Sequence, residues 1–349
     1  LSIMDKLLTE LPTAHYSALE LQQKLKNTLG RFSPAIKLHT LIHETKTTIP
    51  VFTLRCSVLR EQLDTAFDLI MEVLQTTDFT QKDKIREILQ QMDEHSRQFA
   101  VRSGHTLALS TVASAFTAKD AVDAALNGAP SIQYLHCFMK DFDRYYEKLR
   151  DMLQTVQKEV FCQSRMMFAS VSSAKDADLE PLLQRFPAGT AVPEQASYHA
   201  DIPARSGNVI PAQIGFAVQG ACISQMGMPD IEYNHKWRVA TKIITLSYLW
   251  NMVRVQGGAY GTGLLLRNNG TMLTYSFRDP SPARTLEVNQ GISDFIRSFC
   301  ESDEPIDKYI ISTVSDTNPL MSAFSQGVLA DDRWAAHITE EYCNQDIQA

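Results

Sequence analysis

Apolar residues recur at helical spacing through much of the chain, interrupted by shorter strand-like runs. In the first half, Ser17 and Glu20 have the spacing of a capping box and predict a helix that stops at Gly30. Strand-like runs follow over 32–38 and 51–59, and Leu63 begins a long amphipathic helix. Beyond these, the pattern predicts a helical region capped by Thr80 and Asp83, further helix over 132–161, a short strand over 166–171 and a helix over 176–183.

The second half repeats this order of elements. A strand over 212–223 precedes a helix over 231–253, and two strands follow over 261–267 and 271–277. The turn Asn268-Asn269-Gly270 joins these strands, because Asn and Gly tolerate the positive φ angles of a tight hairpin. Asp279-Pro280 then predicts the start of a helix that extends through Phe299.

Helix, hairpin and helix therefore occur twice, which indicates an internal duplication. The first copy lacks the leading strand, so either it is truncated by the start of the chain or its missing strand comes from elsewhere. The segment 186–211 contains four prolines and predicts a linker between domains 1–185 and 212–349. The predicted fold class is α+β, with two homologous domains that each pack an antiparallel sheet against helices.

Composition narrows the possible functions. The 349 residues are 44% hydrophobic and 21% charged, as in ordinary globular proteins, and the net charge of -7 argues against a nucleic-acid or anionic-membrane binder. The six cysteines are widely spaced and form no Cys-x-x-Cys pair, which disfavours a disulfide scaffold or a cysteine zinc site. No apolar run is long enough for a transmembrane helix, and no signal or targeting segment is recognisable, so we expect a cytoplasmic protein.

The segment from Arg254 to Gly263 is the richest in candidate chemistry. It reads Arg-Val-Gln-Gly-Gly-Ala-Tyr-Gly-Thr-Gly, and its glycines would let a ligand approach the backbone closely. A phosphate loop is disfavoured, because glycines of that kind follow a strand and open a helix, whereas these follow a helix and open a strand. A tight turn with an edge tyrosine is the plain structural interpretation. Trp237 and Trp250 are predicted to be core or helix-packing residues.

A resemblance sharpens this picture. The run Leu249-Trp-Asn-Met-Val-Arg-Val-Gln-Gly-Gly-Ala-Tyr-Gly261, followed by Asn269-Gly270 and by Tyr275-Ser-Phe-Arg-Asp-Pro280, resembles the pitrilysin/insulinase family of zinc peptidases, and within it the presequence proteases. The two domains resemble the third and fourth of the four homologous domains of those enzymes. The resemblance implies the LuxS/insulinase-like fold and a chain that is truncated at both ends.

The resemblance also implies a role. Members of the family close two halves around an unfolded peptide, and the C-terminal half supplies an arginine and a tyrosine that reach the substrate at the zinc. Those positions match Arg254 and Tyr260, as transition-state and substrate contacts, and Gly257, Gly258, Ala259 and Gly261 are the implied substrate-binding positions. A phenol can donate to the oxyanion at the scissile carbonyl, and a guanidinium can hold a peptide carbonyl.

The zinc motif of the family, His-x-x-Glu-His, is not found around any of the nine histidines. His39 and His43 flank Ile42 in place of the glutamate, and Glu341 stands where a second histidine would follow His337. We therefore expect no metal ligand in this chain, with zinc bound by a missing N-terminal catalytic half that lies on the same chain or on a separate subunit. The expected partners are that half and a peptide substrate, with no nucleic acid and no membrane.

The expected function is that of the non-catalytic half of a zinc metalloendopeptidase that degrades short unstructured peptides. The alternative is a catalytically inactive family member that acts as a peptide-binding or scaffold subunit. Because presequence-protease relatives work in organelles or in bacterial cytoplasm, the organellar matrix is the alternative location.

Overall fold

The computed structural model describes residues 3–40, 45–172, 179–189, 198, 203–223, 236–267, 269–317 and 319–341. The elements of the first half are α1 (Met4–Glu10), α2 (Ala18–Thr28), β1 (Leu29–His39), β2 (Ile49–Val58), α3 (Leu63–Thr76), α4 (Lys82–Arg102), α5 (Gly104–Ala113), α6 (Ala118–Asn127), α7 (Ala129–Lys140), α8 (Phe142–Val160) and α9 (Glu180–Leu183). Those of the second half are β3 (Val218–Cys222), α10 (Lys236–Ile243), the π-helix η4 (Ile244–Val255), β4 (Gly261–Leu266), β5 (Thr271–Phe277), α11 (Pro282–Gln290), α12 (Ile292–Cys300), α13 (Asp307–Thr317) and α14 (Ala323–Ala335). This mixture of helices and small antiparallel sheets confirms the predicted α+β class.

The first half is built on the long antiparallel hairpin β1–β2, in which Phe32 pairs with Cys56 and Ile36 pairs with Phe52. Side chains on alternate positions of a strand point to opposite faces, so Phe32, Phe52 and Cys56 share the face that packs against the main hydrophobic core. Helices α1, α2, α3, α4 and α8 contribute most of the buried side chains of that core. The predicted capping box is confirmed, because the Ser17 hydroxyl accepts from the Glu20 N–H while the Glu20 carboxylate accepts from the Ser17 N–H.

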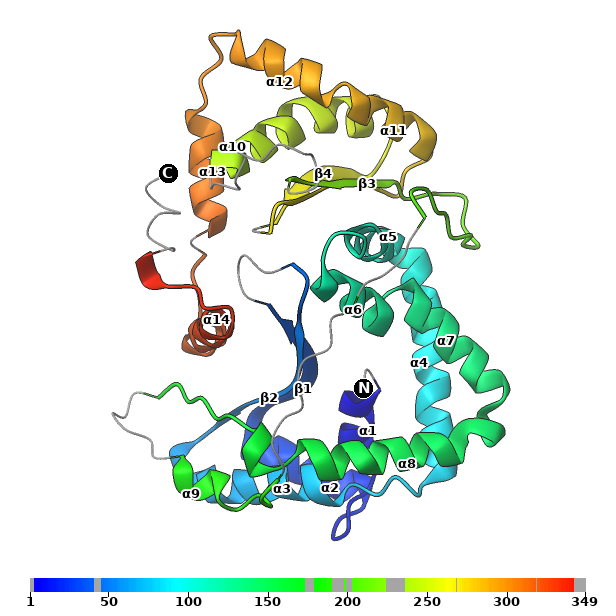
Figure 1. The fold of residues 1–349 in the computed structure, drawn as a ribbon, viewed down its shortest axis with the longest axis vertical. Helices are drawn as coiled ribbons and strands as arrows, with labels where there is room; N and C mark the ends of the chain where they lie inside the picture. Colours follow the sequence, from blue (N-terminus) through cyan, green and yellow to red (C-terminus); the bar gives the residue numbers. More distant parts are fainter. Residues whose placement is uncertain are drawn as a thin grey trace.

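The opposite face of the hairpin is polar and is covered by the last helix of the described chain. Lys37 donates to both carboxylate oxygens of Asp332 on α14 at 2.5 and 2.7 Å, and Arg55 donates to Asp332 at 3.2 Å. The guanidinium of Arg31 stacks over the ring of Phe324, 4.5 Å from its centroid. Figure 1 shows α13 and α14 descending from the second half toward this hairpin. Charged contacts therefore hold α14 against β1–β2 more than the burial of apolar side chains does.

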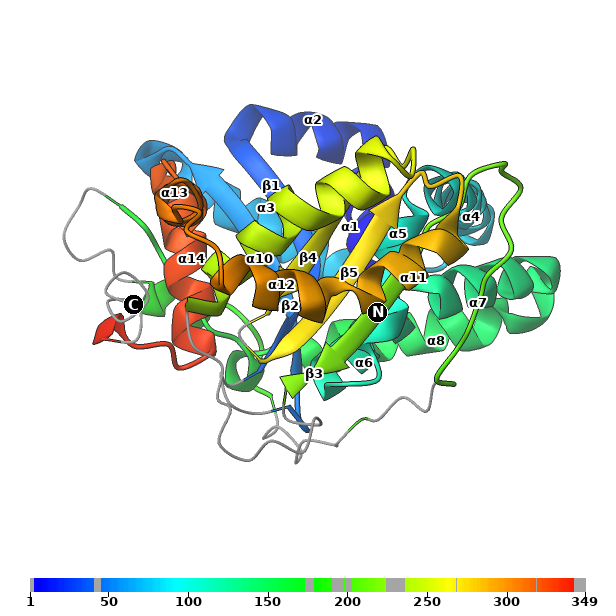
Figure 2. The ribbon, with the colours of Figure 1, turned by 90° about the horizontal axis from the view of Figure 1, so that it is seen from above.

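The second half contains a three-stranded antiparallel sheet in the order β3-β5-β4. The predicted hairpin is confirmed as β4–β5, with Gly270 at φ 81° in its turn, although Asn268 of that turn lies outside the described residues. The predicted leading strand is β3, which pairs with β5. Helices α10, α11, α12 and η4 lie on one side of the sheet, as the two orthogonal views show (Figures 1 and 2). The order helix, hairpin, helix thus occurs twice, as α2, β1, β2, α3 and as η4, β4, β5, α11.

Helix α5, which belongs to the first half, covers the other side of this sheet and contacts β3 and β5. His105 on α5 lies against three aromatic rings, with centroid separations of 4.6 Å to Phe277, 5.9 Å to Tyr275 and 6.0 Å to Phe216. Next to this cluster, Arg267 at the end of β4 donates to the buried carboxylate of Asp120 on α6. We call these contacts the joint, because they fasten the two halves together.

Several local predictions were wrong or incomplete. Residues 166–171 form no strand, although Met166 and Phe168 still pack against the core. The helix expected through Phe299 is divided at Gly291 into α11 and α12, and the helix expected over 231–253 continues as a π-helix from Ile244. The turn before α4 is stabilised by Asp78, which accepts from the Thr80 N–H at 2.8 Å, whereas Thr80 and Asp83 do not cap the helix.

The predicted domain boundaries stay a prediction. The described parts of the 186–211 segment contain no helix or strand, while Phe186 is buried in the core of the first half. Among the described helices, none combines the length and apolar character needed to cross a membrane.

The joint predicts a stability effect for Asp120→Ala. This substitution leaves Arg267 without its carboxylate and removes the acceptor of the Thr117 hydroxyl, so we expect the free energy of unfolding to fall by roughly 1–3 kcal/mol. Urea unfolding followed by circular dichroism measures this change. Asp123→Ala is the matched control on the same helix, because Asp123 bonds to Asn127 one turn away and not to the second half. Equal losses for the two variants would contradict the assignment.

The joint also predicts a pH dependence. Burial lowers the pKa of His105, because loss of contact with water disfavours the charged imidazolium, and among the described residues its Nδ1 has no hydrogen-bond partner. The unfolded chain, with an ordinary histidine pKa of about 6.5, then binds the proton more readily than the folded chain. The contribution of His105 to stability is therefore present above about pH 6.5 and is lost as the pH falls through its lowered folded pKa. His105→Phe should flatten this part of the stability curve between about pH 7.5 and 5.5, whereas parallel curves would refute the prediction.

Candidate functional site

The candidate site begins where the π-helix η4 turns into β4. The N–H of Gln256 donates to the Asn251 carbonyl at 3.0 Å, which is the five-residue spacing of a π-helix. The N–H of Gly258 then donates to Arg254 at 3.0 Å and that of Ala259 to Val253 at 3.2 Å, so nested bonds close the helix end. This arrangement resembles a Schellman motif widened to fit the π-helix.

Two of the glycines are required by this turn itself. Gly258 has φ 81°, a left-handed conformation that side chains with a Cβ adopt only at a cost. A Cβ on Gly257 would lie 2.4 Å from the carbonyl oxygen of Val253, which is too close for any side chain. The glycine pair therefore reverses the chain sharply and brings Tyr260 back beside the end of η4.

Arg254 and Tyr260, the two predicted substrate contacts, are brought together by this turn. The guanidinium carbon of Arg254 lies 5.9 Å from the centroid of the Tyr260 ring. The same carbon lies 4.0 Å from the centroid of the Trp250 ring. Within the described part of the chain, the Arg254 side chain has no ion pair or hydrogen bond, so its N–H donors are available to a ligand.

Tyr260 is held at its backbone and ring but not at its hydroxyl. Its N–H donates to the Phe277 carbonyl at 3.0 Å, and its ring meets the Phe277 ring edge to face at a centroid distance of 5.8 Å. The side chain is 68% exposed, and its hydroxyl has no hydrogen-bond partner among the residues that the structure describes. The contacts of its backbone and ring therefore orient the Tyr260 side chain, and its hydroxyl is free to donate a hydrogen bond.

The other predicted substrate-binding positions differ in their surroundings. Ala259 is buried in a small core with Leu249 and Val253, so only its backbone can meet a ligand. Gly261 begins β4 and pairs with Phe277, with room for a Cβ at ordinary contact distance. Substrate binding at Gly257, Gly258, Ala259 and Gly261 stays a prediction.

Arg278 and Asp279 follow Phe277 at the end of β5. Asp279 is buried and accepts from the Ser281 N–H at 2.7 Å and from the Thr285 hydroxyl at 2.6 Å, so it anchors the start of α11. Arg278 has a φ of 49°, which is unusual for a residue with a side chain. Arg278 follows Phe277, the residue that contacts both the backbone and the ring of Tyr260. The unusual φ of Arg278 was not predictable from residue types.

The described residues contain no group of three or more His, Cys, Asp or Glu side chains that could hold a metal ion. His39 ends β1, whereas His43 lies outside the described residues. His337 occupies a turn after α14 with φ 55°. The donor sets therefore do not fit a zinc site in the described chain.

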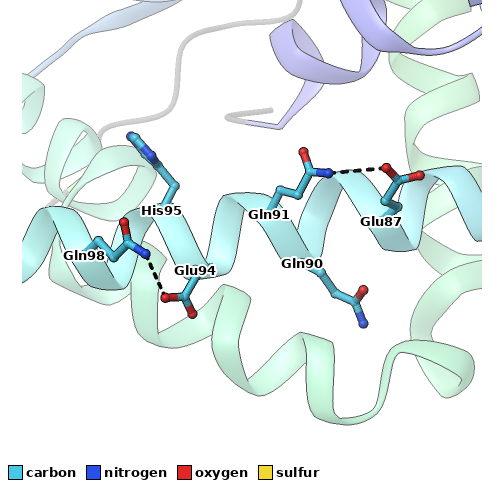
Figure 3. A pocket seen from close by; sticks show the side chains of 6 residues that line it. All are labelled: Glu87, Gln90, Gln91, Glu94, His95 and Gln98. Carbon is cyan, nitrogen blue, oxygen red and sulfur yellow. Dashed lines mark hydrogen bonds between the residues drawn. The ribbon is translucent and has the colours of Figure 1, made fainter.

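A surface hollow lies along α4, and Figure 3 shows the side chains that line it. They are all polar, and two pairs bond to each other along the helix, Gln91 to Glu87 at 3.3 Å and Gln98 to Glu94 at 3.0 Å. Ligand sites are usually concave and mainly apolar, with a few convergent polar groups. This surface is therefore a solvated helix face.

Comparison with known proteins identifies the family. Two family models match, one for a domain associated with the C subfamily of the M16 peptidases, over residues 1–137, and one for the "PreP C-terminal domain", over residues 207–347. This chain belongs to the pitrilysin (M16) peptidase family. Its second matched region, which is a presequence-protease C-terminal domain, contains Arg254 and Tyr260.

Curated relatives agree with this assignment. The chain is 23% identical to Presequence protease 1, chloroplastic/mitochondrial, of Arabidopsis thaliana over 97% of its own length and 33% of the relative's. It is 25% identical to the mitochondrial presequence protease of Saccharomyces cerevisiae over 85% of its own length and 31% of the relative's. The chain thus spans about a third of the length of these M16 relatives.

Solved structures share the fold. A peptidase M16 inactive domain from Pseudomonas fluorescens superposes with a TM-score of 0.63 at 15% identity, covering 99% of this chain and 80% of that one. The periplasmic protease PqqL from Escherichia coli gives a TM-score of 0.54 at 11% identity, covering 99% of this chain and 39% of that one. The fold is therefore shared by proteins of very different sequence.

The turn predicts different outcomes for two neighbouring glycines. Gly258→Ala forces a left-handed alanine and should lower the free energy of unfolding by about 1–2 kcal/mol. Gly261→Ala is the matched control, because its added Cβ meets only the Phe277 side chain, at 3.7 Å or more. Thermal unfolding of both variants measures the difference. A larger loss for Gly261→Ala would show that the turn geometry is not what requires glycine.

Proposed function

We propose that this M16 half closes a peptidase chamber over an unfolded peptide and supplies Arg254 and Tyr260 to the substrate at the zinc of the catalytic half. The observation that carries the proposal is the pairing of these two side chains at one turn, with donors on both that no described residue occupies. The sequence resemblance motivates their roles, and the geometry supports them.

Each side chain suits a distinct task. The exposed hydroxyl of Tyr260 can donate a hydrogen bond to the oxygen on which negative charge develops during attack on a peptide carbonyl. The guanidinium of Arg254 presents several N–H donors in one plane and can hold a neighbouring peptide carbonyl. Because the backbone holds Tyr260 at Phe277, the phenol needs little reorganisation when a substrate arrives.

The metal would come from the N-terminal half. Zinc, when bound there, would polarise the scissile carbonyl and activate a water molecule. The residues of this chain act on the substrate and not on the metal, since its described donor sets do not fit zinc. The catalytic half, on the same chain or on a separate subunit, is therefore the proposed partner.

The sheet offers a way to bind the peptide backbone. Among the described strands, β4 lies at the edge of the order β3-β5-β4 and begins at Gly261, directly after Tyr260. An extended peptide can add to such an edge through main-chain hydrogen bonds, and this mode favours short unstructured substrates. The names of the Arabidopsis and yeast relatives favour an organellar matrix as the compartment, with the cytoplasm as the alternative.

The test is Tyr260→Phe in the full-length enzyme that contains the catalytic half. Loss of one oxyanion donor should lower kcat for an unstructured peptide by about 10²-fold, with a smaller change in KM. Tyr134→Phe is the matched control, because Tyr134 is similarly exposed, at 72%, but lies on α7 in the first half. Unchanged turnover for Tyr260→Phe would remove this residue from catalysis and contradict the proposed function.

A further inference from the structure

Trp250 is an aromatic residue of η4 that is only partly buried. It is 38% exposed, whereas its neighbour Leu249 is completely buried in the small core behind the sheet. The same alternation recurs one turn later, where Val253 is buried and Arg254 follows it. Trp250 and Arg254 therefore lie together on the solvent side of the helix. Trp250 was predicted to be a core or helix-packing residue, and of these two roles the core role is wrong.

The indole ring is the closest restraint on the Arg254 guanidinium. Their separation of 4.0 Å is in the range of a strong cation–π contact, and tryptophan gives the strongest such contacts. The ring of Tyr260 lies farther away, at 5.9 Å. Since no carboxylate of the described chain pairs with Arg254, the two aromatic rings are what restricts its long side chain.

A stacked guanidinium differs chemically from one held by a carboxylate. Stacking engages the planar face and leaves the N–H edges free, whereas an ion pair would use the same N–H groups that a peptide carbonyl needs. Stacking also limits the rotamers of a side chain that would otherwise lose much freedom on binding a substrate. Trp250 can thus orient Arg254 without competing for its donors.

We propose that Trp250 is a positioning residue, whose indole holds the Arg254 guanidinium in the orientation that meets the peptide carbonyl. This inference rests on the proposed function of Arg254. If the inference holds, kcat/KM depends on which ring stands at position 250, and this dependence disappears when Arg254 is removed.

The experiment is a graded double-mutant cycle in the full-length enzyme with an unstructured peptide substrate. Cation–π strength falls from tryptophan through tyrosine and phenylalanine to leucine, so kcat/KM should fall in that order, with an about tenfold loss for Trp250→Leu. In the Arg254→Ala background, the same substitutions should change kcat/KM less than about twofold. Leu246→Ala, at another exposed apolar position of η4, is the control and should match the parent.

Each outcome decides between the two proposals. If Arg254→Ala keeps the parent's turnover, the proposed function of Arg254 fails and the inference fails with it. If Arg254→Ala is impaired but Trp250→Leu, Phe and Tyr all match the parent, only the inference is overturned. Equal losses in both backgrounds would show that Trp250 merely supports the fold, and would also overturn it. Trp250→Tyr and Trp250→Phe keep a ring in place, so the comparison stands even if Trp250→Leu does not fold.

Discussion

The packing of α5 against the sheet of the second half is the contact on which the rest of the molecule depends. Without it, each half has its own core, but the sheet that carries the candidate site would expose one face to solvent. The aromatic cluster around His105 on α5 lies next to the ion pair between Asp120 on α6 and Arg267, and together they form the joint. Since Phe277 belongs both to that cluster and to the contact with Tyr260, the joint and the candidate site share a side chain.

A π-helix followed by a glycine turn explains how the site is assembled from so few residues. The π-helix brings Trp250 and Arg254 to its solvent side near its end, and the glycine pair returns the chain so that Tyr260 lies beside them. The interior neighbours Leu249, Val253 and Ala259 fix the turn from behind. A substrate contact requires side chains that are held by rigid helices or strands and whose hydrogen-bond donors are free.

Much of this could be predicted from the sequence, for physical reasons that are local. The capping box of Ser17 and Glu20 and the hairpin turn at Gly270 depend on residues close in the chain, so their signals are strong. Residues 166–171 have the composition of a strand, but a strand also needs a partner, which composition does not reveal. The change from α- to π-helix at Ile244 has no such local signal in the residue types. The pairing of Arg254 with Tyr260 was suggested by resemblance, whereas the position of Trp250 depends on which side of the helix the core occupies.

The ion pairs of Lys37 and Arg55 with Asp332 hold α14 against the first hairpin. Lys37 and Asp332 are separated by 295 residues in the sequence, so forming their contact closes a very long loop, at an entropic cost that local contacts do not carry. Local hairpins and helices can form long before this, and charged contacts between distant segments add little to an early nucleus. The helix α14 should therefore dock late in folding and be among the first elements to detach, more readily at high salt, while both cores remain intact. A chain of this kind would pass through a state in which its last helix is free and the cationic face of β1–β2 is uncovered.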